Sequence, residues 1–221
     1  MKRTKLADRE LPVYTKGEEI ANMVTHIIGA AIGIVAIVLC SIKAKNAYGV
    51  VSGVVFGISM IFLYTMSSIY HGLSPKVKGK KVLQILDHCT IFVLIAGSYT
   101  PFALCTLRQY NPQTGWTIFG VIWAVAILGI VLNSIDLKKY NVFSMICYLT
   151  MGWCIIIKIN ILPALLGMKG FILLLVGGII YTLGAIFYGI GRKHKYIHTV
   201  FHVCVLLGNL LHFLCILLYV V

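Results

Sequence analysis

Charged residues are scarce in this chain of 221 residues: Asp, Glu, Lys and Arg together make up 11% of it, and only 6 residues are acidic. Soluble domains usually carry about 25% charged residues. Hydrophobic residues make up 60% and the mean hydropathy is +0.96, which indicates an integral membrane protein. The net charge of +13 therefore does not indicate a nucleic-acid-binding protein, because basic residues in short loops set membrane orientation and meet anionic lipid headgroups.

Two further signals are missing. The 7 cysteines form no C-x-x-C pair and lie in or beside apolar runs, so we expect small, buried, reduced side chains. The first 19 residues are polar and basic, and they lack the short apolar stretch and cleavage site of a secretory signal peptide. We therefore expect an uncleaved, polar N-terminal segment at 1–19.

Long apolar segments fill the remainder of the chain. A membrane-spanning helix needs roughly 20 such residues, and inside lipid only a helix here satisfies its own backbone. The sequence predicts an all-α integral membrane protein, with a seven-transmembrane helix bundle over 20–221. The segments are 20–42, 48–70, 83–107, 116–135, 142–157, 171–190 and 196–221. The fifth is the weakest, because Lys158 follows it and Pro163 lies just beyond.

Lysine and arginine are distributed unevenly over the predicted loops. Of the 19 residues of these two types, 14 fall in the N-terminal segment or in loops on the same side of the bundle, and 5 fall on the opposite side. Because cytoplasmic loops of membrane proteins carry the excess of positive charge, we expect the N-terminus in the cytoplasm and the C-terminus outside. The predicted location is the cytoplasmic (inner) membrane.

Ionisable residues inside membrane segments are functional candidates, since they are expensive to bury. His71 ends the second segment, Asp87 begins the third, and His198 and His202 begin the seventh. All four lie at the predicted cytoplasmic side. His198 and His202 are four residues apart, so both rings lie on one helix face. Ser67 shares a face with His71 for the same reason. The sequence therefore predicts that three imidazoles, a carboxylate and a hydroxyl converge.

Three neutral imidazoles suit zinc, because catalytic zinc sites often combine three protein ligands with a water. Zinc lowers the pKa of that water, and Asp87 would hold or deprotonate it, or orient a ligand. Ser67 would hydrogen-bond the water, a substrate carbonyl or Asp87. Hydrogen bonding between helices without metal is the alternative for the histidines, a helix-start charge for Asp87, and simple packing for Ser67.

The other histidines fit less well with a shared metal. His26 and His88 lie at the same depth, and we expect them to pack around the ligands rather than to bind the metal. His194 belongs to a basic, solvated run. His212 is about 15 Å along the helix from His202, which is too far to share an ion.

The pattern of Ser67, His71, Asp87, His198 and His202 resembles the hemolysin III family, the bacterial branch of the progestin and adipoQ receptor superfamily. Supporting stretches are 18–22, Thr25-His26, Tyr70-His71, 86–88, 96–102, Gly115-Trp116 and 198–213. The resemblance implies seven helices with a cytoplasmic N-terminus. It also implies zinc held by His71, His198 and His202, with Asp87 and Ser67 around the zinc-bound water. The superfamily is similar to membrane hydrolases that cleave lipid amides such as ceramide.

Three hypotheses follow. The first is a zinc-dependent hydrolase that acts on an amide or ester bond of a membrane lipid. The second is a regulator or sensor of membrane state, in which zinc is a structural clip between helices. The third is a lytic pore former, as the haemolysis in the family's name suggests. The apolar segments favour stable spans over pieces that insert from water. The sequence predicts no oligomeric state.

Overall fold

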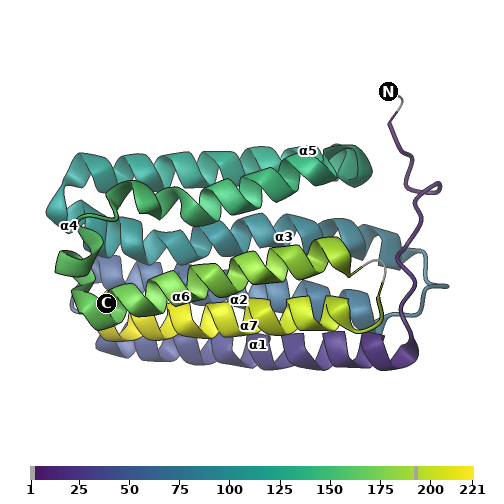
Figure 1. The fold of residues 1–221 in the computed structure, drawn as a ribbon, viewed down its shortest axis with the longest axis horizontal. Coiled ribbons are helices and arrows are strands. Elements are labelled where there is room, and N and C mark those ends of the chain that lie inside the picture. Colours follow the sequence, from purple (N-terminus) through teal and green to yellow (C-terminus); the bar gives the residue numbers. More distant parts are fainter. Residues whose placement is uncertain (1–2, 192–193) are drawn as a thin grey trace.

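The apolar segments fold into long helices packed side by side (Figure 1). The computed structural model describes residues 3–191 and 194–221. Within these residues, six helices are long and apolar enough to cross a membrane. The order is α1 (Lys16–Lys43), α2 (Ala47–Gly72), α3 (Gly79–Pro101), the π-helix η1 (Phe102–Leu107), α4 (Arg108–Tyr110), α5 (Pro112–Trp153), the 3₁₀-helix η2 (Cys154–Lys158), α6 (Leu162–Ile190) and α7 (Ile197–Tyr219).

Helix α5 contains two of the predicted segments, because it doubles back at Asp136. There the backbone is extended, with φ −158° and ψ 94°. The Ser144 hydroxyl donates to Asn133 Oδ1 at 2.6 Å, and Asn133 Nδ2 lies 3.4 Å from the Tyr148 hydroxyl. Asn133 and Tyr148 are separated by 15 positions in the sequence, and in a straight helix they would lie about 22 Å from each other. The two arms therefore run antiparallel (Figure 1), and Asp136 Oδ1 caps the second arm by accepting from the Lys138 and Lys139 N–H groups.

Two helix starts differ from the sequence expectation. Helix α1 begins at Lys16 instead of residue 20, because Thr15 and Glu18 form a capping box that satisfies its first N–H groups. Helix α6 begins at Leu162 and includes Pro163 in its first turn, where a proline is tolerated. A break at Gly167 follows, with φ +66°, a conformation that favours glycine.

Small residues let the first two helices approach closely. A Cβ on Gly57 would lie 2.8 Å from the carbonyl oxygen of Gly33, so only hydrogen atoms fit at this crossing. Close approach through small residues is a common way for helices to associate in membranes. The cysteines of the described residues are all free, and five are buried as predicted, while Cys154 and Cys204 are partly exposed.

One end of the bundle gathers the polar connections. The N-terminal segment, the α2–α3 connection, the α5 reversal and the α6–α7 connection all lie there (Figure 1). The Thr4 N–H donates to Asp136, Lys81 Nζ donates to the Ala7 carbonyl, and the Tyr196 N–H donates to Glu18. Most of the basic residues on the predicted cytoplasmic side lie at this end, while Lys2, Arg192 and Lys193 fall outside the described residues.

Candidate metal centre

Three histidines from two helices meet at the polar end of the bundle. His71 lies in the last turn of α2, and His198 and His202 lie in the first turns of α7. The ring centroids of His71 lie 5.5 Å from His198 and 4.9 Å from His202, and those of His198 and His202 are 4.7 Å apart. One nitrogen from each ring lies within 4.8 Å of the others. The predicted convergence of the three rings is confirmed.

The donor set fits a metal ion. The Nε2 atoms of His198 and His202 are 3.1 Å apart, close to the roughly 3.3 Å between two nitrogen ligands of a tetrahedral zinc ion. Within the described part of the chain, His71 Nε2 is buried without a hydrogen-bond partner. Buried polar atoms in folded proteins nearly always have a partner. An ion held between the rings would supply the partner that His71 Nε2 lacks.

Glu19 fixes the ring of His71. Its Oε2 lies 2.6 Å from His71 Nδ1, and its Oε1 accepts from Lys80 Nζ at 2.6 Å. A carboxylate on Nδ1 places the proton there, which leaves the Nε2 lone pair for a metal. Lys80 is only 1% exposed and also donates to the Leu73 carbonyl. Glu19 was not among the candidate site residues predicted from the sequence. It belongs to the acidic pair Glu18-Glu19 in the first turn of α1.

Helix α1 also holds the seventh helix in place. The Thr199 hydroxyl donates to Asn22 Oδ1 at 2.6 Å. His26, one turn further along α1, stacks on His202 with a centroid separation of 3.8 Å. On the polar side, the Tyr14 ring stacks on His198 at 4.9 Å. The candidate metal centre is therefore enclosed by α1, α2, α7 and the N-terminal segment, and His26 packs against a ligand ring as the sequence predicted.

Replacing Glu19 by glutamine should weaken metal binding at this candidate centre by about 10- to 100-fold, the usual cost of removing a partner that orients a ligand. The amide keeps the shape of the side chain but loses the charge that holds the Nδ1 proton of His71 and pairs with buried Lys80. Competition with a chromogenic zinc chelator measures the affinity. The matched control is Glu10→Gln, at an exposed glutamate of the N-terminal segment. Equal affinities for the two variants would contradict this positioning role.

Ser67 and Asp87 lie on the wall of a buried cavity beside the three histidines. The cavity has a volume of about 140 Å³, and His202 is the member of the triad that lines it. Ser67 Oγ is buried without a partner among the described residues. Asp87 Oδ2 lies 3.8 Å from His88 Nδ1. The rest of the cavity wall is mainly apolar, with side chains from α3, α5, α6 and α7.

The remaining histidines lie outside the triad. His88 contacts the Gln84 carbonyl and the Tyr188 hydroxyl. His212 Nε2 contacts the Leu174 carbonyl at 3.2 Å, deep in the bundle. His194 is exposed at the polar end. The structure thus places these three side chains apart from the candidate metal centre, as predicted for His194 and His212.

A family model described as "Haemolysin-III related" matches residues 14–213. The chain belongs to this haemolysin-III related family. The matched range contains every residue of the candidate metal centre, together with Glu19, Ser67 and Asp87. The chain is 44% identical to Hemolysin-3 of Bacillus cereus over 207 residues, which cover 92% of each chain. It is 42% identical to the Hemolysin-3 homolog of Bacillus subtilis over 212 residues, 95% of this chain and 97% of the relative.

The haemolysin-III related chain also has more distant relatives in animals. It is 26% identical over 206 residues to the human Monocyte to macrophage differentiation factor, with coverage of 90% of this chain and 83% of the relative. The likeness spans nearly the whole fold. A multi-pass membrane protein of the hemolysin III type is therefore established, in agreement with the resemblance seen in the sequence.

Proposed function

We propose that this protein is a zinc-dependent hydrolase of the cell membrane that cleaves an amide or ester bond of a lipid. The observation that carries the proposal is the shared cavity: His202 of a metal-competent triad lines the same buried, mainly apolar space as Asp87 and Ser67. A pocket with apolar walls and a few convergent polar groups is typical of a site for an apolar substrate.

We further propose that both arms of α5 cross the membrane, which gives seven spans with a cytoplasmic N-terminus. The reversal at Asp136 supports this topology, because it returns the chain to the opposite end of the bundle (Figure 1). The basic N-terminal segment and the lysines near Asp136 lie at one end, as the cytoplasmic excess of positive charge requires.

The proposed chemistry divides roles among the residues of the cavity. A bound zinc ion would act as a Lewis acid toward a carbonyl oxygen and make water a better nucleophile near neutral pH. Asp87 would accept a proton from the attacking water and return it to the leaving group. The Ser67 hydroxyl would donate a hydrogen bond to the substrate carbonyl, a role supported by its Oγ, which is buried without a partner among the described residues. The apolar wall would hold the acyl chain.

Zinc analysis and a lipid turnover assay on one preparation of the full chain test the proposal. We expect about one zinc ion per chain and release of fatty acid from a lipid amide or ester. A chelator should abolish release, and added zinc should restore it. Stoichiometric zinc with no release from a panel of lipid amides and esters would remove the hydrolase and leave the metal site.

One observation favours a second candidate, a structural zinc clip. The triad joins α2 to α7, and Glu19 and Asn22 tie α1 to the same place. An ion there would brace three helices without any reaction, as a sensor of membrane state would require. The two candidates differ in the role of Asp87, which is needed only for the reaction.

A further inference from the structure

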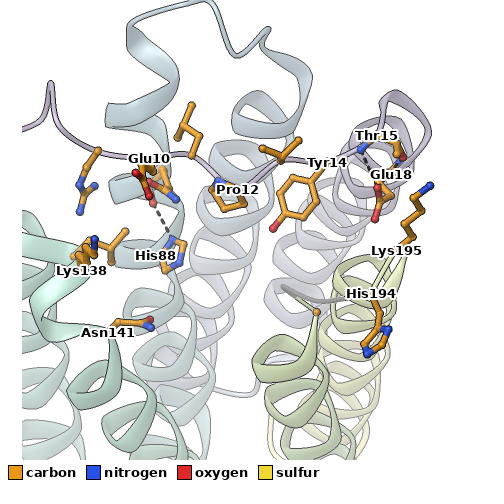
Figure 2. A pocket seen from close by; sticks show the side chains of 16 residues that line it. Glu10, Pro12, Tyr14, Thr15, Glu18, His88, Lys138, Asn141, His194 and Lys195 are labelled. Carbon is orange, nitrogen blue, oxygen red and sulfur yellow. Dashed lines mark hydrogen bonds between the residues drawn. The ribbon is translucent and has the colours of Figure 1, made fainter.

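A second, larger pocket opens at the polar end of the bundle. It has a volume of about 630 Å³ and lies beneath residues 9–15, within the range usual for ligand pockets, roughly 300–1,000 Å³. Figure 2 shows Pro12 and Tyr14 passing over it. His88, Lys138 and Asn141 lie on one side, and Glu18, His194 and Lys195 lie on the other.

Arg9 lines this pocket with a buried charge that its surroundings compensate only in part. The residue is only 8% exposed, and its Nη1 has no hydrogen-bond partner within the described part of the chain. Burial lowers the pKa of Arg9, and the nearby carboxylate of Asp136 opposes this only in part. Arginine nevertheless stays protonated in proteins, and an unpaired buried charge is costly. An anion is therefore the ligand that this side chain lacks.

Among the described residues, no carboxylate forms an ion pair with Arg9. Asp136 already accepts from three backbone N–H groups, those of Thr4, Lys138 and Lys139. Glu18 Oε1 accepts from the Tyr196 N–H, and its Oε2 accepts from the Thr15 N–H. Exposed Glu10 is the remaining carboxylate of the pocket wall, which also carries the exposed amines of Lys138 and Lys195. The pocket wall thus carries three cationic side chains, Arg9, Lys138 and Lys195, and two carboxylates, Glu10 and Glu18.

The polar pocket and the apolar cavity adjoin each other. His88 and Asn141 line both spaces. A molecule that filled both would be an amphiphile, with its anionic end beside Arg9 and its apolar end near Ser67 and His202. Arginine binds phosphate oxygens through two parallel N–H groups, and anionic headgroups are plentiful at the cytoplasmic leaflet.

We infer that the pocket beneath residues 9–15 binds the phosphate of an anionic lipid headgroup through Arg9 and Lys138, while the acyl chain of the same lipid enters the buried cavity. The inference rests on the proposed function where it names the substrate class, a phosphate-bearing lipid. Headgroup binding itself requires no metal. It therefore remains measurable in protein stripped of zinc, whether or not the protein hydrolyses anything.

The test measures binding of three probes to the full chain in a neutral detergent. These are dioctanoyl phosphatidylglycerol, dioctanoylglycerol without phosphate, and inorganic phosphate. Arg9→Gln should weaken binding of the phosphatidylglycerol by about tenfold or more, the value of one charge-assisted contact. It should leave binding of dioctanoylglycerol and the zinc content unchanged. Lys138→Gln should have a smaller effect in the same direction.

Matched controls separate a built site from general surface charge. Lys5→Gln removes a charge from the same segment, and Lys139→Gln removes one from the neighbouring residue; neither side chain lines the pocket.

Losses for these variants as large as for Arg9→Gln would overturn the inference, as would equal affinity for the lipids with and without phosphate. Inorganic phosphate that binds as tightly as the lipid would overturn the lipid assignment. Much weaker but Arg9-dependent binding of phosphate would support it. If the wild type turns over no lipid but its lipid binding still depends on Arg9, only the hydrolase proposal is refuted.

Discussion

His202→Ala should leave the purified protein almost free of zinc. Apparent zinc-binding free energies of about 10–16 kcal/mol in four-ligand sites average about 2.5–4 kcal/mol per ligand. A loss of that size lowers affinity at least a hundredfold or so, and the alanine also removes the ring on which His26 stacks. Metal analysis after gel filtration should show about one equivalent in the wild type and less than about 0.1 in the variant.

His212→Ala is the matched control for this loss. It removes a second, partly buried imidazole from the same helix, but that ring contacts the Leu174 carbonyl and lies outside the triad. The control should therefore retain its zinc even if the fold loses some stability. Zinc at the wild-type level in both variants, with the secondary structure preserved, would mean that the metal does not need His202. Equal loss in both would mean that disturbance of α7, not removal of a ligand, releases the ion.

The convergence of the histidines could be predicted because it depends on helix geometry and on counting spans. Spacing by four places His198 and His202 on one face of any helix. Alternating span direction then puts the end of the second segment and the start of the seventh at the same side. Neither step needs side-chain packing. The structure confirms the outcome, with the ring of His71 4.9–5.5 Å from the other two.

Features that depend on contacts between distant segments were not predictable. A glutamate near a helix start is ordinarily favoured by the helix dipole alone, so nothing local indicates that Glu19 contacts His71 and Lys80. That contact depends on how α1 packs against α2. The same holds for Arg9, whose position follows from the path of residues 9–15 across the bundle end. A connection between the segments 116–135 and 142–157 was predicted, but its confinement to one extended residue, Asp136, was not, because this position carries no glycine or proline signal.

Asp87→Asn should lower lipid turnover by about 10²- to 10⁴-fold, the usual contribution of a general acid–base group, while zinc content stays at the wild-type level. The amide keeps the size of the side chain on the cavity wall but cannot accept a proton from water. The triad contains no atom of Asp87, so the metal site is not expected to change. Turnover and zinc must be measured on the same preparation, with Asp8→Asn at an exposed position as the control.

This variant also separates the two candidate functions, because a structural clip makes no use of a proton acceptor. If zinc only braces α2 against α7, Asp87→Asn should keep both zinc and whatever activity the wild type shows in membranes. If Asp87 were instead a ligand, zinc would fall together with turnover, as for His202→Ala. If turnover is lost and zinc is retained, the hydrolase is the function that remains. The Asp87 carboxylate then acts on substrate or water in the cavity that it shares with His202 and Ser67.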